Sequence, residues 1–362
     1  MLEESVSTAS HVSVAITTTD VDDVLTTGNE PIGQSASVSR GADFYFKCAV
    51  VIIGIVGAAA NALILYAMIA SDQRKKHLLI FHQNACDLCS CLFQVVAYTL
   101  KLCDIPLTGT LGYWLCVTLY GESFVWCSID ASVVNLMSVT IERYLKVVRP
   151  KWSKKLLRKW VIYLVIAFSW IVSILYNMTL VFSTSGVIGG VCYTGAFWKS
   201  RLAAILHTVW YFVSFFVVVI FVFFLCYWRI LVVIRRQASV MAGHSGTAGS
   251  SAVQTQSHHI QSNVIKTMIL VSAFYVIAWM PIRVYYMILL LNSNTQFIES
   301  VYYAVTFIAF LYICANPFIY ATKFDPVKRI LVGFIPCKKP AQEVDESVGT
   351  SGTRRTVQTT HA

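Results

Sequence analysis

Residues 301–322 read VYYAVTFIAFLYICANPFIYAT, an uninterrupted apolar stretch that contains no charged residue. A helix that crosses a bilayer needs about 20 mostly apolar residues, and six further runs of this kind lie upstream. The seven predicted spans are Phe44–Ala70, Leu78–Leu100, Tyr113–Val147, Trp160–Phe182, Leu202–Ile234, Val264–Leu291 and Val301–Thr322. Their length and their content of Leu, Ile, Val, Phe and Ala favour helices over barrel strands. The sequence therefore predicts an all-α membrane protein, a bundle of seven transmembrane helices.

The composition of the 362 residues excludes other broad classes. Hydrophobic residues make up 57% and charged residues 13%, about half the charged share of a soluble domain. The apolar content is too high for a disordered chain. The net charge of +10 comes largely from lysines and arginines beside the spans, so we do not expect nucleic acid as a partner.

The distribution of lysine and arginine predicts the orientation in the membrane. Eighteen of these residues flank the spans on one side and five on the other, and the richer side is expected to be cytoplasmic. We expect a multi-pass protein of the plasma membrane with an extracellular N-terminus. The predicted parts are a disordered extracellular tail (1–42), a membrane core (43–323), a short amphipathic cytoplasmic surface helix (324–336) and a cytoplasmic tail (337–362). Within the core, the stretch Gln237–His259 is rich in Ser, Gly, Ala and Gln and predicts a flexible cytoplasmic linker.

Three polar side chains inside the spans are candidates for a cation site. Lipid penalises polar groups, so Asp87, Ser132 and Asn316 default to a functional hypothesis. Their oxygen atoms suit a small hard cation. The alternative is that they only bond to one another and hold the helices together.

A second set of residues lies at the cytoplasmic end of the third span and in the last two spans. Glu142, Arg143 and Tyr144 place an acid beside an arginine at a helix end, where a plain interfacial anchor is the simpler reading. Pro281 and Pro317 interrupt helix hydrogen bonding and predict hinges, or alternatively only shape packing.

These residues, taken in order, carry a resemblance. The motifs are Asn61, Asp87, Glu142-Arg143-Tyr144, Trp170, Tyr227, Ala278-Trp279-Met280-Pro281 and Asn316-Pro317-Phe318-Ile319-Tyr320. Each occurs in the span where the rhodopsin-like (class A) G-protein-coupled receptors carry their counterpart. The chain resembles this family from Phe44 to Cys337.

The resemblance implies a role for each motif residue. Arg143 would engage a heterotrimeric G protein once the sixth helix swings outward, and Tyr227 and Tyr320 would support that open state. Trp279 would lie beneath the ligand as a toggle. Asp87, Ser132 and Asn316 would bind sodium in the resting state, and no other cofactor is expected.

The resemblance also implies a disulfide between Cys116 and Cys192 on the outer side and a palmitoylation site at Cys337. Cys103 is a competing disulfide partner, because Cys116 lies two residues further from Arg143 than the family norm. A free thiol is the alternative at Cys337.

Other positions depart from the family pattern. Val219 replaces the usual fifth-helix proline, Ala278 replaces a cysteine and Tyr312 replaces an asparagine of the sodium shell.

The outer halves of the spans limit the ligand. Phe310 stands where opsins carry their retinal lysine, and Val125 where amine receptors carry an aspartate, so neither retinal nor a simple amine is expected. The predicted ligand-binding residues are Glu122, Trp126 and Asp130 as one stripe on the third helix, with Arg283, Trp279, Tyr211 and Tyr286, and with Trp210 and His207 as further walls.

Two interpretations of these charges remain open. Arg283 either receives an anionic ligand group while Glu122 receives a cationic one, as a peptide or zwitterion would require, or pairs internally with Asp130.

The predicted function is a receptor that transmits an extracellular signal to a G protein. The alternative is a transporter or channel with Asp87 and Asp130 in its permeation path. We recognise no nucleophile–base pair in the spans, so we do not expect an enzyme. The Ser/Thr-rich C-terminal tail resembles the substrates of receptor kinases and arrestin, although ordinary disorder gives the same composition.

Overall fold

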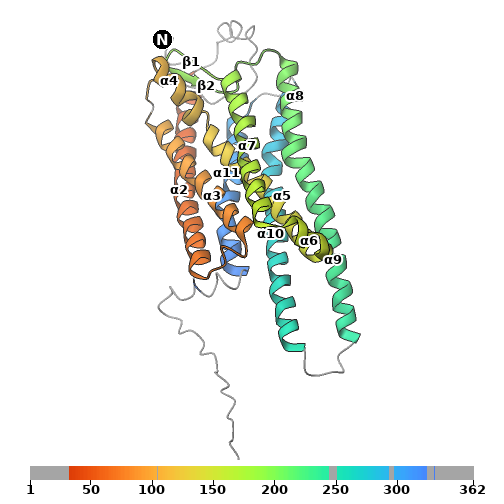
Figure 1. Cartoon of the computed structure of the whole chain (residues 1–362). Coiled ribbons are helices and arrows are strands. Elements are labelled where there is room, and N and C mark those ends of the chain that lie inside the picture. Colours follow the sequence, from red (N-terminus) through yellow and green to blue (C-terminus); the bar gives the residue numbers. More distant parts are fainter. Residues whose placement is uncertain (1–31, 104, 244–250, 293–296, 324–329, 331–362) are drawn as a thin grey trace, which may run out of the picture.

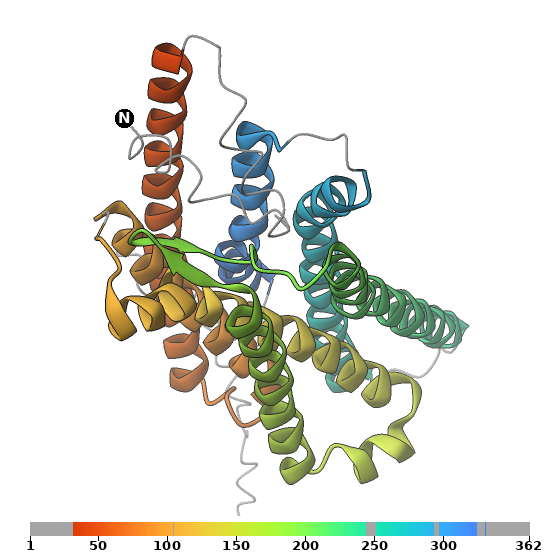
Figure 2. The same cartoon turned by 90° about the horizontal axis from the view of Figure 1, so that it is seen from above.

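The computed structural model describes residues 32–103, 105–243, 251–292, 297–323 and 330. In this part of the chain, seven helical segments are long and apolar enough to cross a membrane. They stand side by side as one bundle (Figure 1) and enclose a shared interior when seen from above (Figure 2). The predicted seven-helix membrane bundle is therefore confirmed.

The described helices are, in chain order, α2 (Ile32–Ala70), α3 (Leu78–Leu102), α4 (Gly109–Leu115), α5 (Ser123–Val148), α6 (Pro150–Leu156), α7 (Lys159–Thr184), α8 (Arg201–Phe212), α9 (Val218–Gly243), α10 (Ser251–Leu291) and α11 (Glu299–Lys323). Two short π-helical segments, η2 (Cys116–Tyr120) and η3 (Val213–Val217), lie in the third and fifth spans. The strands β1 (Gly186–Ile188) and β2 (Val191–Tyr193) form an antiparallel hairpin between α7 and α8.

Two predicted boundaries are wrong because helix continues into polar sequence. The first helix already begins at Ile32, inside the segment 1–42 that was expected to be a disordered tail. Helix α9 continues to Gly243 and helix α10 already begins at Ser251. Both ends lie inside the stretch Gln237–His259, where composition predicted a flexible linker. Alanine and glutamine are adequate helix formers, and each segment continues a helix already nucleated in the membrane.

The third span is interrupted rather than continuous. Helix α4 is followed directly by the π-helix η2. Glu122 then adopts the left-handed conformation, with φ at 55°, before α5 begins at Ser123. This π-helix and break accommodate the two extra residues between Cys116 and Arg143. The fifth span also contains a π-helix, η3, although Val219 replaces the usual proline. A π-helical bulge therefore forms in the fifth span without that proline.

The outer hairpin is tied to the third span by a disulfide. Cys116 and Cys192 are bonded, with their sulfur atoms 1.99 Å apart, whereas Cys103 is a free, exposed thiol. Cys192 pairs with Val187 across the hairpin. The predicted pairing of Cys116 with Cys192 is confirmed.

The bundle is packed around aromatic side chains and closes tightly at one glycine. Trp279, Tyr275, Tyr312 and Phe310 are among the largest fully buried side chains. At Gly57 of α2, an added Cβ would lie 2.6 Å from the Cys314 Sγ, so no side chain fits between α2 and α11 at this height. Large apolar side chains point outward along the spans, as expected where the solvent is lipid.

Three predicted features lie outside the described residues. They are the surface helix 324–336, of which only the helical Ile330 is described, the tail 337–362 and the palmitoylation candidate Cys337.

Candidate functional site

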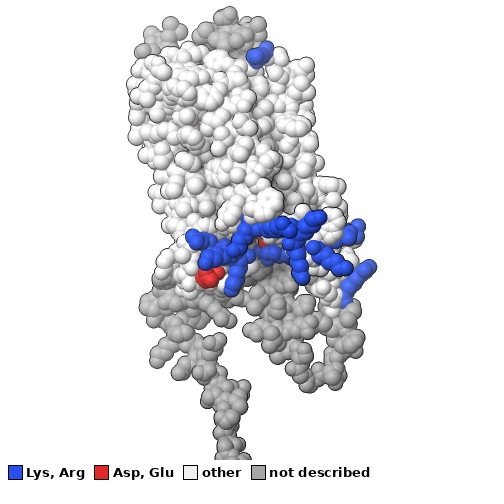
Figure 3. All heavy atoms as spheres, in the orientation of Figure 1, with Lys and Arg blue, Asp and Glu red and all other residues white. Residues whose placement is uncertain are grey.

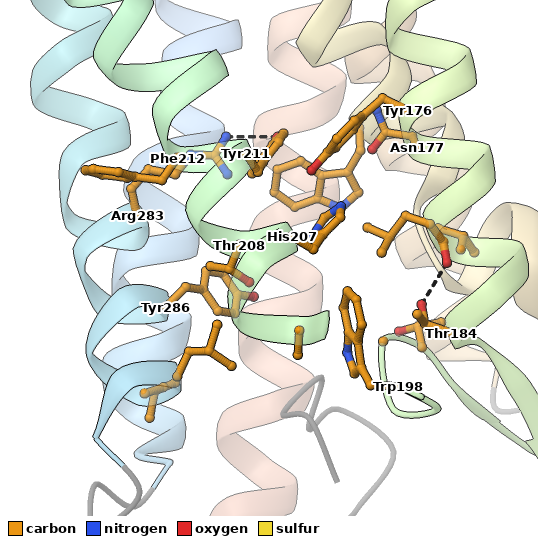
Figure 4. A pocket seen from close by; sticks show the side chains of 18 of the residues that line it. Tyr176, Asn177, Thr184, Trp198, His207, Thr208, Tyr211, Phe212, Arg283 and Tyr286 are labelled. Atoms are coloured by element: carbon orange, nitrogen blue, oxygen red, sulfur yellow. Dashed lines mark hydrogen bonds between the residues drawn. The ribbon is translucent and has the colours of Figure 1, made fainter. Parts of the chain in front are cut away.

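A cavity of about 250 Å³ lies at the outer end of the bundle, between α5, α7, α8, α10 and the loop that follows β2 (Figure 4). Its walls include Trp126, Tyr176, Trp198, His207, Tyr211 and Arg283. The predicted ligand residue Tyr286 also lines it. Most of the wall is aromatic or aliphatic, which is typical of small-molecule sites.

Arg283 is the charged residue of this wall and is only 7% exposed. Its Nη2 donates to the Tyr211 hydroxyl at 3.0 Å, as drawn in Figure 4. Its guanidinium carbon lies 4.2 Å above the Tyr211 ring and 4.9 Å from the Trp279 ring centre. Among the described residues, nothing bonds to its Nε. The guanidinium is therefore stacked on two rings and keeps an unused donor.

Asp130 is connected to Arg283 through a hydroxyl group. Tyr211 donates to the Asp130 Oδ1 at 2.8 Å, and the Asn177 amide donates to Oδ2 at 2.9 Å. No ion pair within 4.0 Å joins Asp130 to Arg283, although both are described. Arg283 therefore neither pairs directly with Asp130 nor is fully available to a ligand. The Tyr211 hydroxyl bridges the two charges, and the Arg283 Nε stays unpaired. Asp130 itself does not line the cavity.

A ladder of stacked rings forms the wall on the side of α7 and α8. The Tyr176 ring stacks on His207 at 5.1 Å and on Tyr211 at 5.3 Å, and Trp198 lies 5.3 Å from His207. The His207 Nε2 is buried and has no partner in the described part of the chain. The prediction of Trp210 as a wall is wrong, because its side chain is 64% exposed on the outside of the bundle.

Glu122 does not share a stripe with Trp126 and Asp130. Because it precedes α5 in a left-handed conformation, its carboxylate turns to α3 and bonds to Lys101. It does not line the cavity. The prediction that Glu122 receives a cationic ligand group is therefore wrong for this geometry.

Trp279 lies one layer below the cavity. Its side chain is fully buried and does not line the cavity. Its ring meets Trp126 edge to face at 6.0 Å and lies under the Arg283 guanidinium. Phe310, which stands at the retinal-lysine position, packs against Trp126 at 6.3 Å. Ligand contacts with Arg283 or Trp126 would thus reach Trp279 through direct packing.

In the middle of the membrane, the structure brings together the three predicted sodium ligands. Ser132 donates to the Asp87 Oδ1 at 2.7 Å, and the Asn316 amide donates to Oδ2 at 2.9 Å. Both carboxylate oxygens therefore already accept hydrogen bonds, while the Asn316 Oδ1 is buried and has no hydrogen-bond partner among the described residues. Asn316 is followed by Pro317, which lies inside α11 as Pro281 lies inside α10.

A chain of hydrogen bonds extends from Ser132 to the fourth span. Gln83 donates to Ser132 and accepts from Asn135 at 2.8 Å. Asn135 in turn lies 3.0 Å from the His82 Nδ1, and Trp170 donates to the His82 Nε2 at 2.9 Å. Since Nε2 accepts from Trp170, His82 carries its proton on Nδ1 and donates to Asn135. Each donor points toward Asp87.

At the opposite end of the bundle, Arg143 contacts a loop histidine. Its Nη2 bonds to the His77 Nδ1 at 3.0 Å, whereas the nearest oxygen of Glu142 lies 3.9 Å away. Glu142 instead bonds to Lys146. Burial and the nearby positive charges of Arg143, Lys146 and Lys76 lower the pKa of His77 from 6.5 to about 3. His77 is therefore neutral, and its Nδ1 accepts a hydrogen bond from Arg143.

The predicted coupling tyrosines are Tyr227 on α9, Tyr144 on α5 and Tyr320 on α11. The Tyr227 hydroxyl lies 3.0 Å from the Thr140 hydroxyl and 2.9 Å from that of Ser272, so it joins α9, α5 and α10. Tyr144 is half-buried against the core. The side chain of Tyr320 lies outside the described part of the structure. On the face drawn in Figure 3, lysines and arginines form a belt at this end of the bundle, near α6.

Sequence reasoning missed three residues of these sites. His77 stands in a short loop, and no pattern indicated that it faces Arg143. Trp198 follows the outer hairpin without a recognisable motif. Asn177 carried a signal, a polar residue inside the fourth span, but it also begins the only Asn-x-Thr glycosylation motif. Its side chain is buried, at 6% exposure, and bonded to Asp130.

Comparisons with known proteins agree with this geometry. Residues 60–320 match the model of the family described as "7 transmembrane receptor (rhodopsin family)". Lysophosphatidic acid receptor 3 of Rattus norvegicus is 24% identical over 282 residues, which cover 77% of this chain and 75% of the relative. The allatostatin-A receptor of Bombyx mori is 22% identical over 89% of this chain and 86% of its own. The crystal structure of squid rhodopsin superimposes with a TM-score of 0.67 at 15% identity, over 82% of this chain and 86% of the other.

Proposed function

The chain belongs to the rhodopsin family of seven-transmembrane receptors, and from this premise we propose that it couples a ligand in the outer cavity to a G protein at Arg143. Members of this family are signalling receptors rather than enzymes, and their partners include a G protein and membrane lipid. The transporter alternative finds no support among the relatives.

The observation that carries the proposal is the position of Arg283. The same guanidinium forms part of the cavity wall and stacks on Trp279, 4.9 Å below. A ligand that draws Arg283 toward itself must change this stacking. Trp279 lies in α10 two residues before Pro281, where the helix lacks one backbone hydrogen bond and bends most easily.

At the cytoplasmic end, the proposed output is the release of Arg143 from His77. A tilt of α10 would separate Ser272 from Tyr227 and open the space beside Arg143 to a G-protein segment. The belt of lysines and arginines near α6 supports a cytoplasmic location for this end, and hence an extracellular N-terminus in the plasma membrane.

The proposal includes several accessory sites. Asp87, Ser132 and Asn316 are proposed to exchange their mutual hydrogen bonds for a sodium ion in the resting state. Cys337 is proposed as a palmitoylation site, and the Ser/Thr-rich tail as the target of receptor kinases and arrestin. These last two rest on sequence.

The proposed ligand is a peptide or a small zwitterion or anion, because Arg283 is a cation with an unused donor. The relatives are named for lysophosphatidic acid and for allatostatin-A, which differ widely, so they do not select among these. Retinal bound as a Schiff base is excluded, since Phe310 and not lysine stands at that position.

The test is signalling in cells that lack endogenous heterotrimers and receive one G-protein class at a time. We expect the wild-type chain to raise basal cyclic AMP or calcium signalling, or to lower cyclic AMP, with at least one class, and R143A to abolish the effect at equal surface expression. R158Q, which removes an exposed arginine of the same end, is the matched control and should signal normally. Ion or solute flux unaffected by R143A, without any G-protein signal, would support the transporter instead.

A further inference from the structure

We propose that the outer cavity selects a ligand group with one negative charge, a carboxylate a few bonds away from an aromatic ring. This inference rests on the proposed function only in treating the cavity as the ligand site. It narrows the ligand class from peptides, zwitterions and anions in general to a single chemical group.

The charges around the cavity favour an anion over a zwitterion or a cation. Among the described residues that line the cavity, Arg283 has the only side chain that is charged at neutral pH, and none of them carries a carboxylate. Glu122 is bonded to Lys101, and both oxygens of Asp130 are occupied. An ammonium group would therefore be buried without a partner, which is costly.

The geometry of Arg283 favours a carboxylate over a phosphate monoester. Two rings cover the guanidinium and Nη2 donates to Tyr211, while the buried Nε has no partner among the described residues, so Arg283 keeps donor capacity at the cavity wall. Guanidinium edges bind carboxylates well. A phosphate monoester carries a charge of about −1.5 to −2 at neutral pH. One arginine whose charge is already shared with Asp130 leaves much of that charge uncompensated.

The aromatic ladder predicts the rest of the ligand group. Trp198, His207 and Tyr176 present ring faces and edges to the cavity, and offset or edge-to-face packing against a further ring is favourable. The volume of about 250 Å³ is just below the range of about 300–1,000 Å³ for drug-sized ligands. One ring with a short acidic chain fits this size, and such a group occurs both in free aromatic acids and at a peptide C-terminus that ends in Phe, Tyr or Trp.

Binding to the purified full-length chain in lipid nanodiscs, without G protein, tests the proposal. The probes share one phenyl ring: 3-phenylpropanoate, its amide, 3-phenylpropylamine, the zwitterion phenylalanine and 3-phenylpropyl phosphate. Their dissociation constants come from the concentration dependence of the thermal unfolding midpoint. We expect 3-phenylpropanoate to bind about tenfold or more tightly than each of the others, the typical effect of one charge-assisted hydrogen bond.

Variants assign the preference to Arg283. R283Q should lower the affinity for 3-phenylpropanoate to that for the amide, and R283K should retain part of the difference. K199Q, which removes an exposed cation beside Trp198, is the matched control and should change nothing. An unchanged unfolding midpoint without probe establishes that each variant is folded. N-acetyl-glycyl-phenylalanine and its amide then separate the two sources, since a peptide ligand predicts that the dipeptide acid binds more tightly than 3-phenylpropanoate, and a free acid predicts the reverse.

The proposal is overturned if the amine, the zwitterion or the phosphate binds as tightly as the carboxylate, or if R283Q keeps the preference. Since no G protein is present, this result leaves the proposed signalling function standing. Conversely, a chain that selects the carboxylate but activates no G protein refutes only the signalling function.

Discussion

Replacing His77 tests whether a neutral loop histidine restrains Arg143. The Nη2 of Arg143 lies 3.0 Å from the His77 Nδ1, whereas the Glu142 Oε2 is 3.9 Å away, beyond hydrogen-bond distance. Because Glu142 bonds to Lys146, it does not replace the histidine. H77A therefore removes the hydrogen bond that is proposed to restrain Arg143.

The expected magnitude follows from this single bond. A hydrogen bond to a charged group contributes about 1.5–3 kcal/mol, and the half-buried His77 favours the lower end of that range. A loss of about 1.5 kcal/mol from the resting state alone shifts the resting-to-active ratio about tenfold. A receptor that is active about 1% of the time would thus become active about 10% of the time.

The assay is basal nucleotide exchange by the purified receptor with its G protein, at equal receptor concentration. We expect H77A to raise the basal rate about tenfold. H77N should stay near wild type, because the asparagine Oδ1 is an acceptor close to the position of Nδ1. K75Q, at an exposed position of the same loop, is the control. A basal rate that is unchanged or lower in H77A, with the protein folded, would refute the assignment of His77 as the restraint.

Three further predictions concern pH, packing and the disulfide. The pKa of His77 is about 3 in the folded chain and near 6.5 in the unfolded chain, so the unfolded state takes up a proton first and stability falls as the pH drops below 6.5. The thermal unfolding midpoint should therefore fall between pH 6.5 and 5 in wild type, and fall less in H77N. Equal falls in the two proteins would contradict the lowered pKa. G57A should destabilise the bundle by about 1–3 kcal/mol, because its Cβ would lie 2.6 and 2.7 Å from two cysteine sulfurs. G41A, in the same helix but with open space around it, should not destabilise the bundle. Equal unfolding midpoints for the two variants would contradict this packing. C116S and C192S should each lower the unfolding midpoint, and the double variant should lower it no further than either single variant. A double variant whose loss equals the sum of the two single losses would contradict the disulfide.

The fold could be predicted from the sequence because a membrane imposes few solutions. Runs such as residues 301–322 cannot remain in water, and in lipid they satisfy their backbone only as helices. The helix ends were less predictable. Polar residues after Gln237 read as a linker, yet they continue a helix, because hydropathy reports where lipid ends and not where a helix ends.

The site could be predicted in part. Asp87, Ser132 and Asn316 meet as their polarity inside the spans suggested. The stripe from Glu122 to Asp130 failed because it assumed a regular helix, whereas the backbone breaks at Glu122 itself. Contacts between distant loops and helices, such as that of His77 with Arg143, depend on tertiary packing and leave no periodic signal.

The central claim is that a movement of α10 exposes Arg143 to a G protein, and a distance measurement tests it most directly. Spin labels at residues 74 and 266, both exposed near the basic end of the bundle, report the separation of the loop before α3 from the start of the sixth span. We predict that adding nucleotide-free heterotrimeric G protein populates a longer distance, and that excess GTP analogue returns it to the shorter one. A distribution that stays the same while the G protein is demonstrably bound would contradict the account.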